Sequence, residues 1–415
     1  MSEFRIDLPE DVAFIINTIE KNGHQAYAVG GCVRDTIMGT TPNDWDITTS
    51  ALPEEVKSLF NKTIDTGIQH GTVTVMLHSV GYEVTTYRID GDYLDGRHPS
   101  CVEFSDRLTD DLCRRDFTIN AMAYNDRTGL VDEYGGIADI NNKVIRCVGN
   151  PVERFTEDAL RMMRAIRFSA QLGFSIESNT YQAIEQLSKN IQKVSMERVC
   201  VELKKTLMSA NPDFCGLYGS TSLFKDILPQ LHESFTARYA KRILLTCKYT
   251  ENELPLKLAA CLSNGTPEDA RNTLRHLRMD NKTIDTVVRL LTHCKTPIEE
   301  TEPAIREALH TYGRDIFNLI IKYETAVIKA SEEVTFISNP GRLKHLMTLK
   351  RMSEEILSRG DCFTIKDLDI TGLDLIEYGL KGTQIGATLN YLLEIVIENP
   401  KLNDKATLIG LLDMK

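Results

Sequence analysis

The stretch VGGCVRDTIMGTTPNDWDI, residues 29–47, places two glycines, an arginine and two aspartates close together in the chain. A β-rich run ends at Gly30 and Gly31, and a helix-like pattern resumes at residue 33, which predicts a turn from a strand into a helix. Such a turn exposes backbone N–H groups, and glycine lets a phosphate approach them without a clash against a Cβ atom. Arg34 is placed to add a charge-assisted contact to the same phosphates. The stretch therefore predicts a phosphate-binding turn built from Gly30, Gly31 and Arg34.

The two aspartates of this stretch, Asp44 and Asp46, flank Trp45 on what the pattern predicts as the next strand. Side chains two apart on a strand point to the same face, so the carboxylates should converge. Hard oxygen ligands suit Mg²⁺, and two such ions about 3.5–4 Å apart are a common device for in-line displacement at phosphorus. Mn²⁺ accepts the same ligands. We expect Asp44 and Asp46 to bind the metal and Glu83, in the apolar strand 82–87, to be the third catalytic carboxylate.

Each of these features also occurs by chance, as an ordinary turn, a surface strand or a solvent-facing acid. Their order is the informative part. A Gly-Gly turn, an Arg-Asp pair, a D-x-D about ten residues on and then a strand acid form a constellation typical of nucleotidyl transfer.

The composition bounds the rest of the chain. A chain of 415 residues with 42% hydrophobic and 26% charged side chains predicts a packed protein of two to four domains. The first residues carry acids, and no apolar run approaches the roughly 20 residues that span a bilayer, so we expect a cytoplasmic protein without a membrane partner. The ten cysteines include no C-x-x-C pair, which favours buried thiols over zinc ligands or disulfides.

The net charge of −11 is unevenly distributed. Residues 1–150 hold 13 basic and 24 acidic side chains, whereas residues 151–415 hold 35 of each. An acidic excess around the predicted catalytic stretch is what a cleft for divalent cations requires. Residues 238–295 hold 11 basic and 6 acidic side chains, which is consistent with a footprint for a phosphate backbone and equally with a solvated helical face.

The hydrophobic pattern divides the chain in two. Up to about residue 146, β-rich runs alternate with helix-like segments, which predicts a small α/β domain. From residue 151 the apolar spacing becomes three and four, which predicts helices throughout. Turn-forming residues at 149–151, 209–212 and 295–297 mark the expected joints.

Four motifs in this order closely resemble those of the class II CCA-adding enzymes, tRNA nucleotidyltransferases of the DNA polymerase beta superfamily. They are GGCVRD at 30–35, DWD at 44–46, RRDFTINAMA at 114–123 and EDALR at 157–161. SMERV at 195–199 and DLIEYGLKGTQIG at 374–386 look like neck-helix and tail elements of bacterial members. The tail segment has Lys-Gly-Thr at 381–383, where Pro-Gly is usual in the family.

The resemblance implies an α+β multidomain fold, with a small N-terminal α/β, polymerase-beta-like nucleotidyltransferase head followed by an all-helical neck, body and tail. The expected boundaries are 1–146 for the catalytic head, 147–208 for a neck that recognises the base, 209–295 for the body and 296–415 for a tRNA-binding tail.

The resemblance also assigns site residues. Arg115 and Asp116 of the RRDF segment are implied to lie beside the nucleotide and its ribose. On a helix Asp158 and Arg161 are surface neighbours, and without context they form an ordinary solvated ion pair. In context, an acceptor beside a donor fits the amine and ring nitrogen of cytosine and of adenine, while guanine and uracil present the reverse order. Arg164 and Arg167 continue along the helix and are expected to line the base side.

The function so implied is template-independent addition of C, C and A to the 3′ end of tRNA from CTP and ATP, including repair of that end, with release of pyrophosphate. The partners are tRNA, contacted at its 3′ end and its acceptor and elbow region, and the nucleotides ATP and CTP. The oligomeric state stays open between monomer and homodimer.

Several alternatives were weighed. A partial enzyme could add only CC or only A, but the segment 89–100 has the length of the family's full flexible loop, which favours complete CCA addition. A poly(A) polymerase of this class carries a basic segment that 167–173 does not resemble. An inactive RNA-binding protein would be expected to lack Asp44 or Asp46. The chain contains no His-Asp dipeptide, so we expect no phosphohydrolase activity of the His-Asp type.

Overall fold

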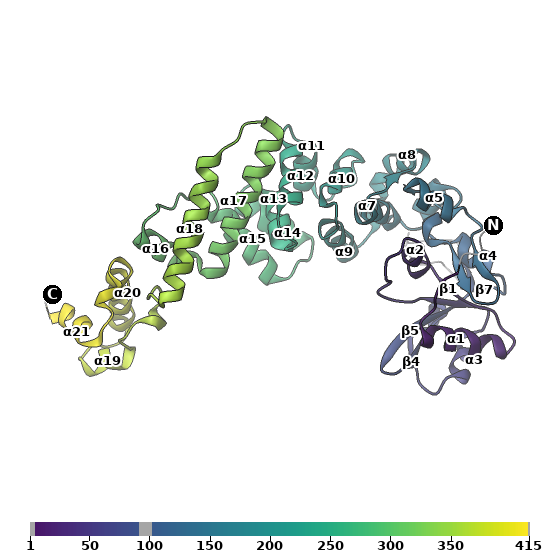
Figure 1. The fold of residues 1–415 in the computed structure, drawn as a ribbon, viewed down its shortest axis with the longest axis horizontal. Coiled ribbons are helices and arrows are strands. Elements are labelled where there is room, and N and C mark those ends of the chain that lie inside the picture. The colour runs from purple at the N-terminus through teal and green to yellow at the C-terminus, as the bar shows by residue number, and fades with distance from the viewer. Residues whose placement is uncertain (1–4, 91–101, 414–415) are drawn as a thin grey trace. The chain divides into compact units, whose positions relative to one another are not determined.

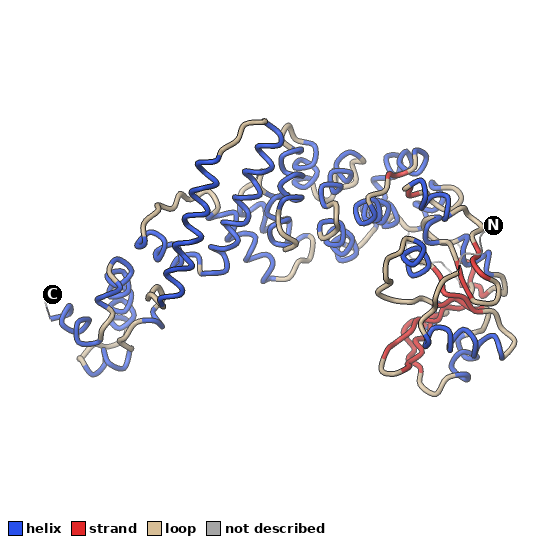
Figure 2. Tube along the Cα trace, viewed as in Figure 1, coloured by secondary structure: helices blue, strands red, loops and turns tan. Residues whose placement is uncertain are grey.

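The computed structural model describes residues 5–90 and 102–413. The chain forms two compact units, Met1–Thr236 and Ala237–Lys415. All strands of the described residues belong to the first unit, and the second is built from helices (Figure 2). The sequence prediction of a small α/β domain followed by helices is therefore confirmed.

A seven-stranded mixed sheet forms the core of the first unit, with the strand order β3-β4-β5-β2-β1-β8-β9. Its two central neighbours β2 and β5 run parallel, while the other neighbouring pairs are antiparallel. The strands are β1 (Ala26–Val29), β2 (Ile47–Thr49), β3 (Thr63–Gly67), β4 (Thr72–Leu77), β5 (Val80–Thr86), β8 (Ala123–Asn125) and β9 (Gly129–Val131). Two small pairs lie outside this sheet, β6 (Arg88–Asp90) with β7 (Val102–Phe104) and β10 (Val144–Ile145) with β11 (Ser175–Ile176).

Helices pack against this sheet and form most of the rest of the first unit. α1 (Glu10–Lys21) buries Val12, Ile15, Ile16 and Ile19 at helical spacing and packs against β1 (Figure 1). The remaining helices of the unit are α2 (Gly31–Ile37), α3 (Pro53–Leu59), α4 (Leu108–Cys113), α5 (Gly136–Asn142), α6 (Pro151–Glu157), α7 (Leu160–Leu172), α8 (Ser178–Leu187), α9 (Met196–Leu207), α10 (Gly216–Ser220) and α11 (Pro229–Thr236). α7 packs against α9, so residues that are distant in sequence meet between these two helices.

Three local predictions were wrong in detail. β2 begins at Ile47, so Asp44 and Asp46 lie in the loop before the strand, which also contains Pro42, a residue without a backbone N–H to donate to a strand partner. The backbone oxygen of Asp46 nevertheless accepts a hydrogen bond from the N–H of Val29 at 3.0 Å, which fixes the loop against β1. The helix after β1 begins at Gly31 instead of residue 33, so Gly30 alone makes the turn.

The third error concerns the helix that was expected to carry Asp158 and Arg161 together. α6 ends at Glu157, Asp158 is extended at φ −139° and ψ 104°, and α7 starts at Leu160. Asp158 therefore lies in a break between two helices. Its carboxylate accepts a hydrogen bond from the N–H of Leu160 at 3.0 Å, a short-range contact with which aspartate commonly interrupts helices.

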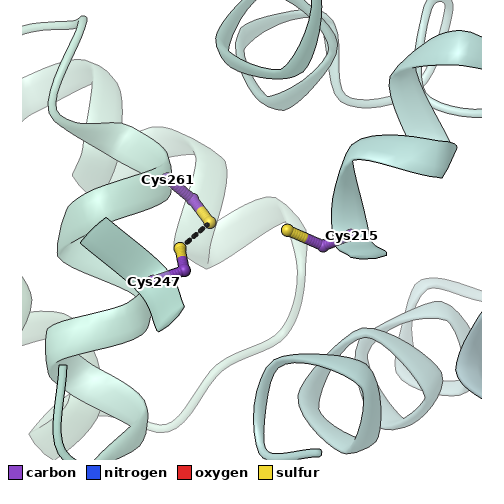
Figure 3. Close-up of side chains that lie close together, drawn as sticks. All are labelled: Cys215, Cys247 and Cys261. Atoms are coloured by element: carbon purple, nitrogen blue, oxygen red, sulfur yellow. Dashed lines mark hydrogen bonds between the residues drawn. The ribbon is translucent and has the colours of Figure 1, made fainter. Parts of the chain in front are cut away.

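The second unit is a set of packed helices. They are α12 (Ala240–Tyr249), α13 (Leu254–Leu262), α14 (Pro267–His276), α15 (Asn281–His293), α16 (Glu302–Tyr312), α17 (Arg314–Thr335), α18 (Pro340–Arg359), α19 (Gly372–Glu377), α20 (Thr383–Glu398) and α21 (Lys405–Asp413). α12 and α13 meet at Cys247 and Cys261, whose Sγ atoms lie 3.4 Å apart (Figure 3). The buried Arg306 donates from Nε to the backbone oxygen of Ile397 at 2.6 Å and so ties α16 to the end of α20.

The unit boundary after Thr236 falls inside the segment 209–295 that was predicted as the body. The finer division into head, neck, body and tail stays a prediction. Among the helices of the described residues, none combines the length and the apolar character needed to cross a bilayer.

Candidate active site

The predicted phosphate-binding turn lies between β1 and α2. Gly30 has φ +86° and ψ −129°, a conformation that side chains rarely adopt. A Cβ atom at this position would lie 3.0 Å from Nη1 of Arg115, whereas a Cβ on Gly31 would lie 3.7 Å from Nη2 of Arg34. The two glycines therefore lie against two arginines, and Gly30 is required both by its backbone and by the guanidinium next to it.

Arg34 is held by polar contacts in this turn. Its Nε and Nη2 donate to Oδ1 of Asp35 at 2.8 and 2.7 Å, and its Nη1 donates to Oδ1 of Asn120 at 2.6 Å. The residue is 8% exposed. A ligand at the turn would therefore meet a guanidinium whose orientation is already fixed.

The three predicted catalytic carboxylates interact with one another. β2 and β5 are parallel with Ile47 opposite Val84, which brings Glu83 level with Asp46. Partial desolvation, with added contributions from the charges of Asp44 and Glu83, raises the pKa of the Asp46 carboxyl to about 6, while the charge of Arg115 lowers it. All three acids stay open to solvent. Carboxylates that destabilise each other's ionised form and remain accessible suit a divalent cation, so this donor set fits Mg²⁺.

Arg115 is positioned by a buried acid that the sequence reasoning missed. Asp111 is fully buried and accepts hydrogen bonds from Nη2 of Arg115 at 2.9 Å and from Nε of Arg114 at 3.0 Å. The hydroxyl of Thr48, on β2, donates to the same carboxylate at 3.2 Å. Asp111 thus connects Arg115 to the strand that follows Asp46.

Asp116 lies at the centre of a second network. Its Oδ2 accepts from Nε of Arg164 at 2.7 Å, and its Oδ1 accepts from the side-chain amide of Asn120 at 3.2 Å. Burial opposes ionisation of this carboxyl, but the guanidinium of Arg164 and the amide of Asn120 outweigh it and lower its pKa to about 2. Because Asn120 also accepts from Arg34, the network reaches from the turn to α7.

The residues predicted to read the base are not paired with each other. The carboxylate of Asp158 accepts from Nη2 of Arg198 at 2.7 Å, and Nη1 of Arg161 donates to Glu157 at 2.7 Å. Nη2 of Arg161 also donates to the backbone oxygen of Arg114 at 3.0 Å. Asp158 and Arg161 therefore do not form the ordinary ion pair that was the alternative to base recognition, and their role in reading the base stays a prediction.

Arg164 and Arg167 differ in accessibility. The side chain of Arg164 is 34% exposed, so it can still reach a ligand. Arg167 is buried, with Nε donating to Glu202 at 2.6 Å and Nη1 donating to Gln171 at 2.9 Å. Of the two arginines, the structure leaves Arg164 open at this site and turns Arg167 inward.

Four residues of these networks were not predicted, and only two of them belong to motifs that the sequence analysis had identified. Asn120 belongs to the RRDFTIN segment and Arg198 to SMERV, so both could have been singled out. Asp111 and Glu202 carry no motif of their own among the segments considered. The loop 89–100, which bears on complete CCA addition, lies almost wholly outside the described residues.

Comparison with known families adds three matches along the chain. Residues 26–146 match the Poly A polymerase head domain, and residues 173–235 match the RNA- and SrmB-binding site of polymerase A. Residues 248–412 match the tRNA nucleotidyltransferase domain 2 model.

Curated relatives and solved structures agree with these matches. The CCA-adding enzyme of Ligilactobacillus salivarius is 37% identical over 411 residues, which cover 98% of this chain and 95% of that protein. That of Leuconostoc mesenteroides is 53% identical over 200 residues, which cover 48% of this chain and 50% of that protein. The crystal structure of Bacillus stearothermophilus CCA-adding enzyme in complex with CTP superposes with a TM-score of 0.76 at 30% identity over 99% of both chains. The Thermotoga maritima enzyme complexed with tRNA shares the fold, with a TM-score of 0.66 at 20% identity over 99% of this chain and 96% of that one.

Proposed function

Because this chain belongs to the CCA-adding enzymes, we propose a mechanism in which the residues described above add C, C and A to the 3′ end of tRNA. The activity is nucleotidyl transfer from CTP and ATP onto tRNA without a nucleic-acid template. The observation that carries this conclusion is the 37% identity that runs through 98% of the chain, with the motif residues gathered on one unit. We propose the cytoplasm as the place of action, because tRNA is the substrate.

The acidic cluster supplies the metal ligands in this proposal. Asp44 and Asp46 would hold Mg²⁺, with Glu83 as a third carboxylate, because their mutual repulsion is relieved by a cation. When bound, such ions stabilise the attacking and leaving oxygens of an in-line displacement at phosphorus. Arg115, held by Asp111, adds a positive charge beside Asp46 and Gly30 and would contact the phosphate that is attacked.

The turn and its arginine bind the rest of the triphosphate. The backbone N–H of Gly31 and the guanidinium of Arg34 would hold the β- and γ-phosphates, which leave as pyrophosphate, while the N–H of Gly30 donates to the backbone oxygen of Met122 at 3.1 Å and shapes the turn. Arg34 is already oriented by Asp35 and Asn120, so binding costs little reorganisation. The 3′-hydroxyl of the tRNA end attacks the α-phosphate and its proton leaves to solvent.

Base selection requires two side chains to exchange partners. Asp158 would leave Arg198 to accept from the exocyclic amine of C or A, and Arg161 would leave Glu157 to donate to the adjacent ring nitrogen. Guanine and uracil present the reverse order of donor and acceptor, so they would leave both side chains unpaired. Asp116 and Arg164 lie next to this site and would orient the nucleoside.

A gel assay at single-nucleotide resolution tests the function. tRNA transcripts that end at the discriminator base, at C and at CC are each incubated with Mg²⁺ and with labelled CTP, ATP, GTP or UTP. Addition of two C and one A, with GTP and UTP ignored, is the expected result. Arrest after CC, or activity on the CC-ended transcript alone, would identify a partial enzyme, and no addition at all would refute the proposal.

A further inference from the structure

One aromatic ring lies beside three of the proposed nucleotide-binding arginines. The guanidinium carbons of Arg34, Arg164 and Arg167 lie 5.1, 5.4 and 4.0 Å from the centroid of the Phe168 ring. All three distances fall within the range of about 6 Å over which a cation is attracted to an aromatic face. Arg34 comes from α2 beside the sheet, while the other two come from α7 with Phe168 itself.

The ring itself is firmly held. Phe168 is 6% exposed and packs edge-to-face on Phe117, with ring centroids 5.8 Å apart and an interplanar angle of 80°. Phe117 is fully buried and directly follows Asp116 in the RRDF segment. The ring therefore has little freedom to move, and the guanidinium groups must adapt to it.

A hydrogen-bond route joins the same two sides of the site. Arg34 donates to Asn120, the amide of Asn120 donates to Asp116, and Asp116 accepts from Arg164. Each bond has a heavy-atom separation of 2.6 to 3.2 Å, so the chain is continuous. The polar route orients both guanidinium groups through their nitrogen atoms, and the Phe168 ring adds an aromatic surface that both groups share.

We propose that Phe168 is a positioning residue that couples the phosphate-binding Arg34 to the base-side Arg164. A flat ring attracts guanidinium groups without using their N–H donors, so those donors stay available for a ligand. Because the ring is held against Phe117, it keeps Arg34 and Arg164 in a fixed relation, so a triphosphate bound to Arg34 favours the correct placement of Arg164. Correct placement of the phosphates and correct reading of the base then favour each other. The inference rests on the proposed function and goes beyond it, because it assigns a role to a buried ring that carries no polar group.

A double-mutant cycle measures this coupling. Arg34→Lys, Arg164→Lys and their combination are compared by kcat/KM for CTP on a transcript that ends at the discriminator base. With Phe168 present, we expect the double variant to lose at least about fivefold less than the product of the two single losses, as residues that act as a unit do. In a Phe168→Leu background, this departure from the product should shrink to the part that the hydrogen-bond route through Asn120 and Asp116 carries.

Two further variants separate positioning from packing. Phe168→Tyr keeps the ring face and should keep the coupling, whereas Phe168→Leu should also raise misincorporation of GTP and UTP relative to CTP by about tenfold. Phe174→Leu is the matched control, because Phe174 is 3% exposed and lies close by in the chain, and it should change neither quantity. Phe168→Met replaces the leucine variant if thermal unfolding shows that the latter does not fold.

The outcomes are distinct. Equal coupling in the phenylalanine and leucine backgrounds would overturn the role of Phe168, as would the same loss of selectivity in the Phe174 control. If the wild-type protein fails to add C or A from CTP or ATP, the proposed function is refuted, and this result is obtained without the double-mutant cycle.

Discussion

The two neighbouring glycines of the predicted turn should respond in opposite ways to the same substitution. Alanine at residue 30 would have to adopt φ +86° and ψ −129°, and its Cβ would lie 3.0 Å from Nη1 of Arg115. Backbone strain of this kind costs about 1–3 kcal/mol, and displacement of Arg115 from its buried partner Asp111 adds to it. We expect Gly30→Ala to lower the free energy of unfolding by about 2–3 kcal/mol.

Gly31 is the matched control. It lies inside α2 with no positive φ, and a Cβ there would make an ordinary contact of 3.7 Å with Arg34. Alanine at such a position stabilises a protein by about 0.4–1 kcal/mol, chiefly by restricting the unfolded chain. Thermal unfolding should therefore show a midpoint about 5–10 °C lower for Gly30→Ala and an unchanged or slightly higher midpoint for Gly31→Ala.

In Gly31→Ala, activity should fall although the protein stays as stable as the wild type. If phosphates lie against the backbone of residue 31, a methyl group there keeps them away and removes a hydrogen bond to a charged group, worth about 1.5–3 kcal/mol. The kcat/KM for CTP should then fall by about 10- to 100-fold in a stable protein. Equal stability of the two variants would refute the reasoning about the turn, and full activity of Gly31→Ala would refute the phosphate-binding role.

The remaining predictions concern the metal ligands, the RNA surface and acid stability. Asp46→Asn should lower the rate of CTP addition by at least about a thousandfold in Mg²⁺ with an unchanged unfolding midpoint, and activity within tenfold of wild type would contradict the metal-ligand assignment. Residues 238–250 hold four basic and no acidic side chains. Replacing the exposed Lys241 and Arg242 by Glu should therefore raise the KM for tRNA roughly tenfold and reduce the slope of log affinity against log salt concentration by about two. An unchanged slope would rule out phosphate contacts at these residues. Burial opposes ionisation of Asp116 but Arg164 outweighs it, so the folded pKa of about 2 lies below the unfolded value and the carboxylate stabilises the protein above about pH 4. This contribution, about 2 kcal/mol, should be lost as the pH falls from about 4 to 2, and acid unfolding of Asp116→Asn should lack that part of the pH dependence.

Local patterns in the sequence predicted much of this fold. The β-branched residues of β4 and the apolar spacing of three and four in α7 are visible in the sequence, because both reflect local preferences of the chain. The Gly-Gly turn was also predicted from a local signal, because a positive φ favours glycine at a single position of the sequence. Asp44 and Asp46 were expected on a strand and found in the loop before it, where the hydrogen bond from the N–H of Val29 to the backbone oxygen of Asp46 holds the loop beside β1.

Contacts between distant segments could not be read in this way. Asp158 pairs with Arg198, 40 residues later, and Thr48 donates to Asp111, 63 residues later. Such partners are chosen by how the helices pack, which no periodicity encodes. The break at Asp158 was missed because the apolar spacing continues through it, and only the carboxylate bonded to the N–H of Leu160 marks the end of one helix and the start of the next.

The pairing found around the base-reading residues bears on how selectivity arises. Asp158 and Arg161 each face an oppositely charged side chain of the protein, Arg198 and Glu157. A nucleobase must replace both partners at once. Only a base with the right order of donor and acceptor forms new hydrogen bonds with both Asp158 and Arg161 in place of the two that are broken. A wrong base would forfeit two charge-assisted hydrogen bonds, each worth about 1.5–3 kcal/mol. In this view the internal ion pairs are part of the selection, because they set the energy that a correct base has to match.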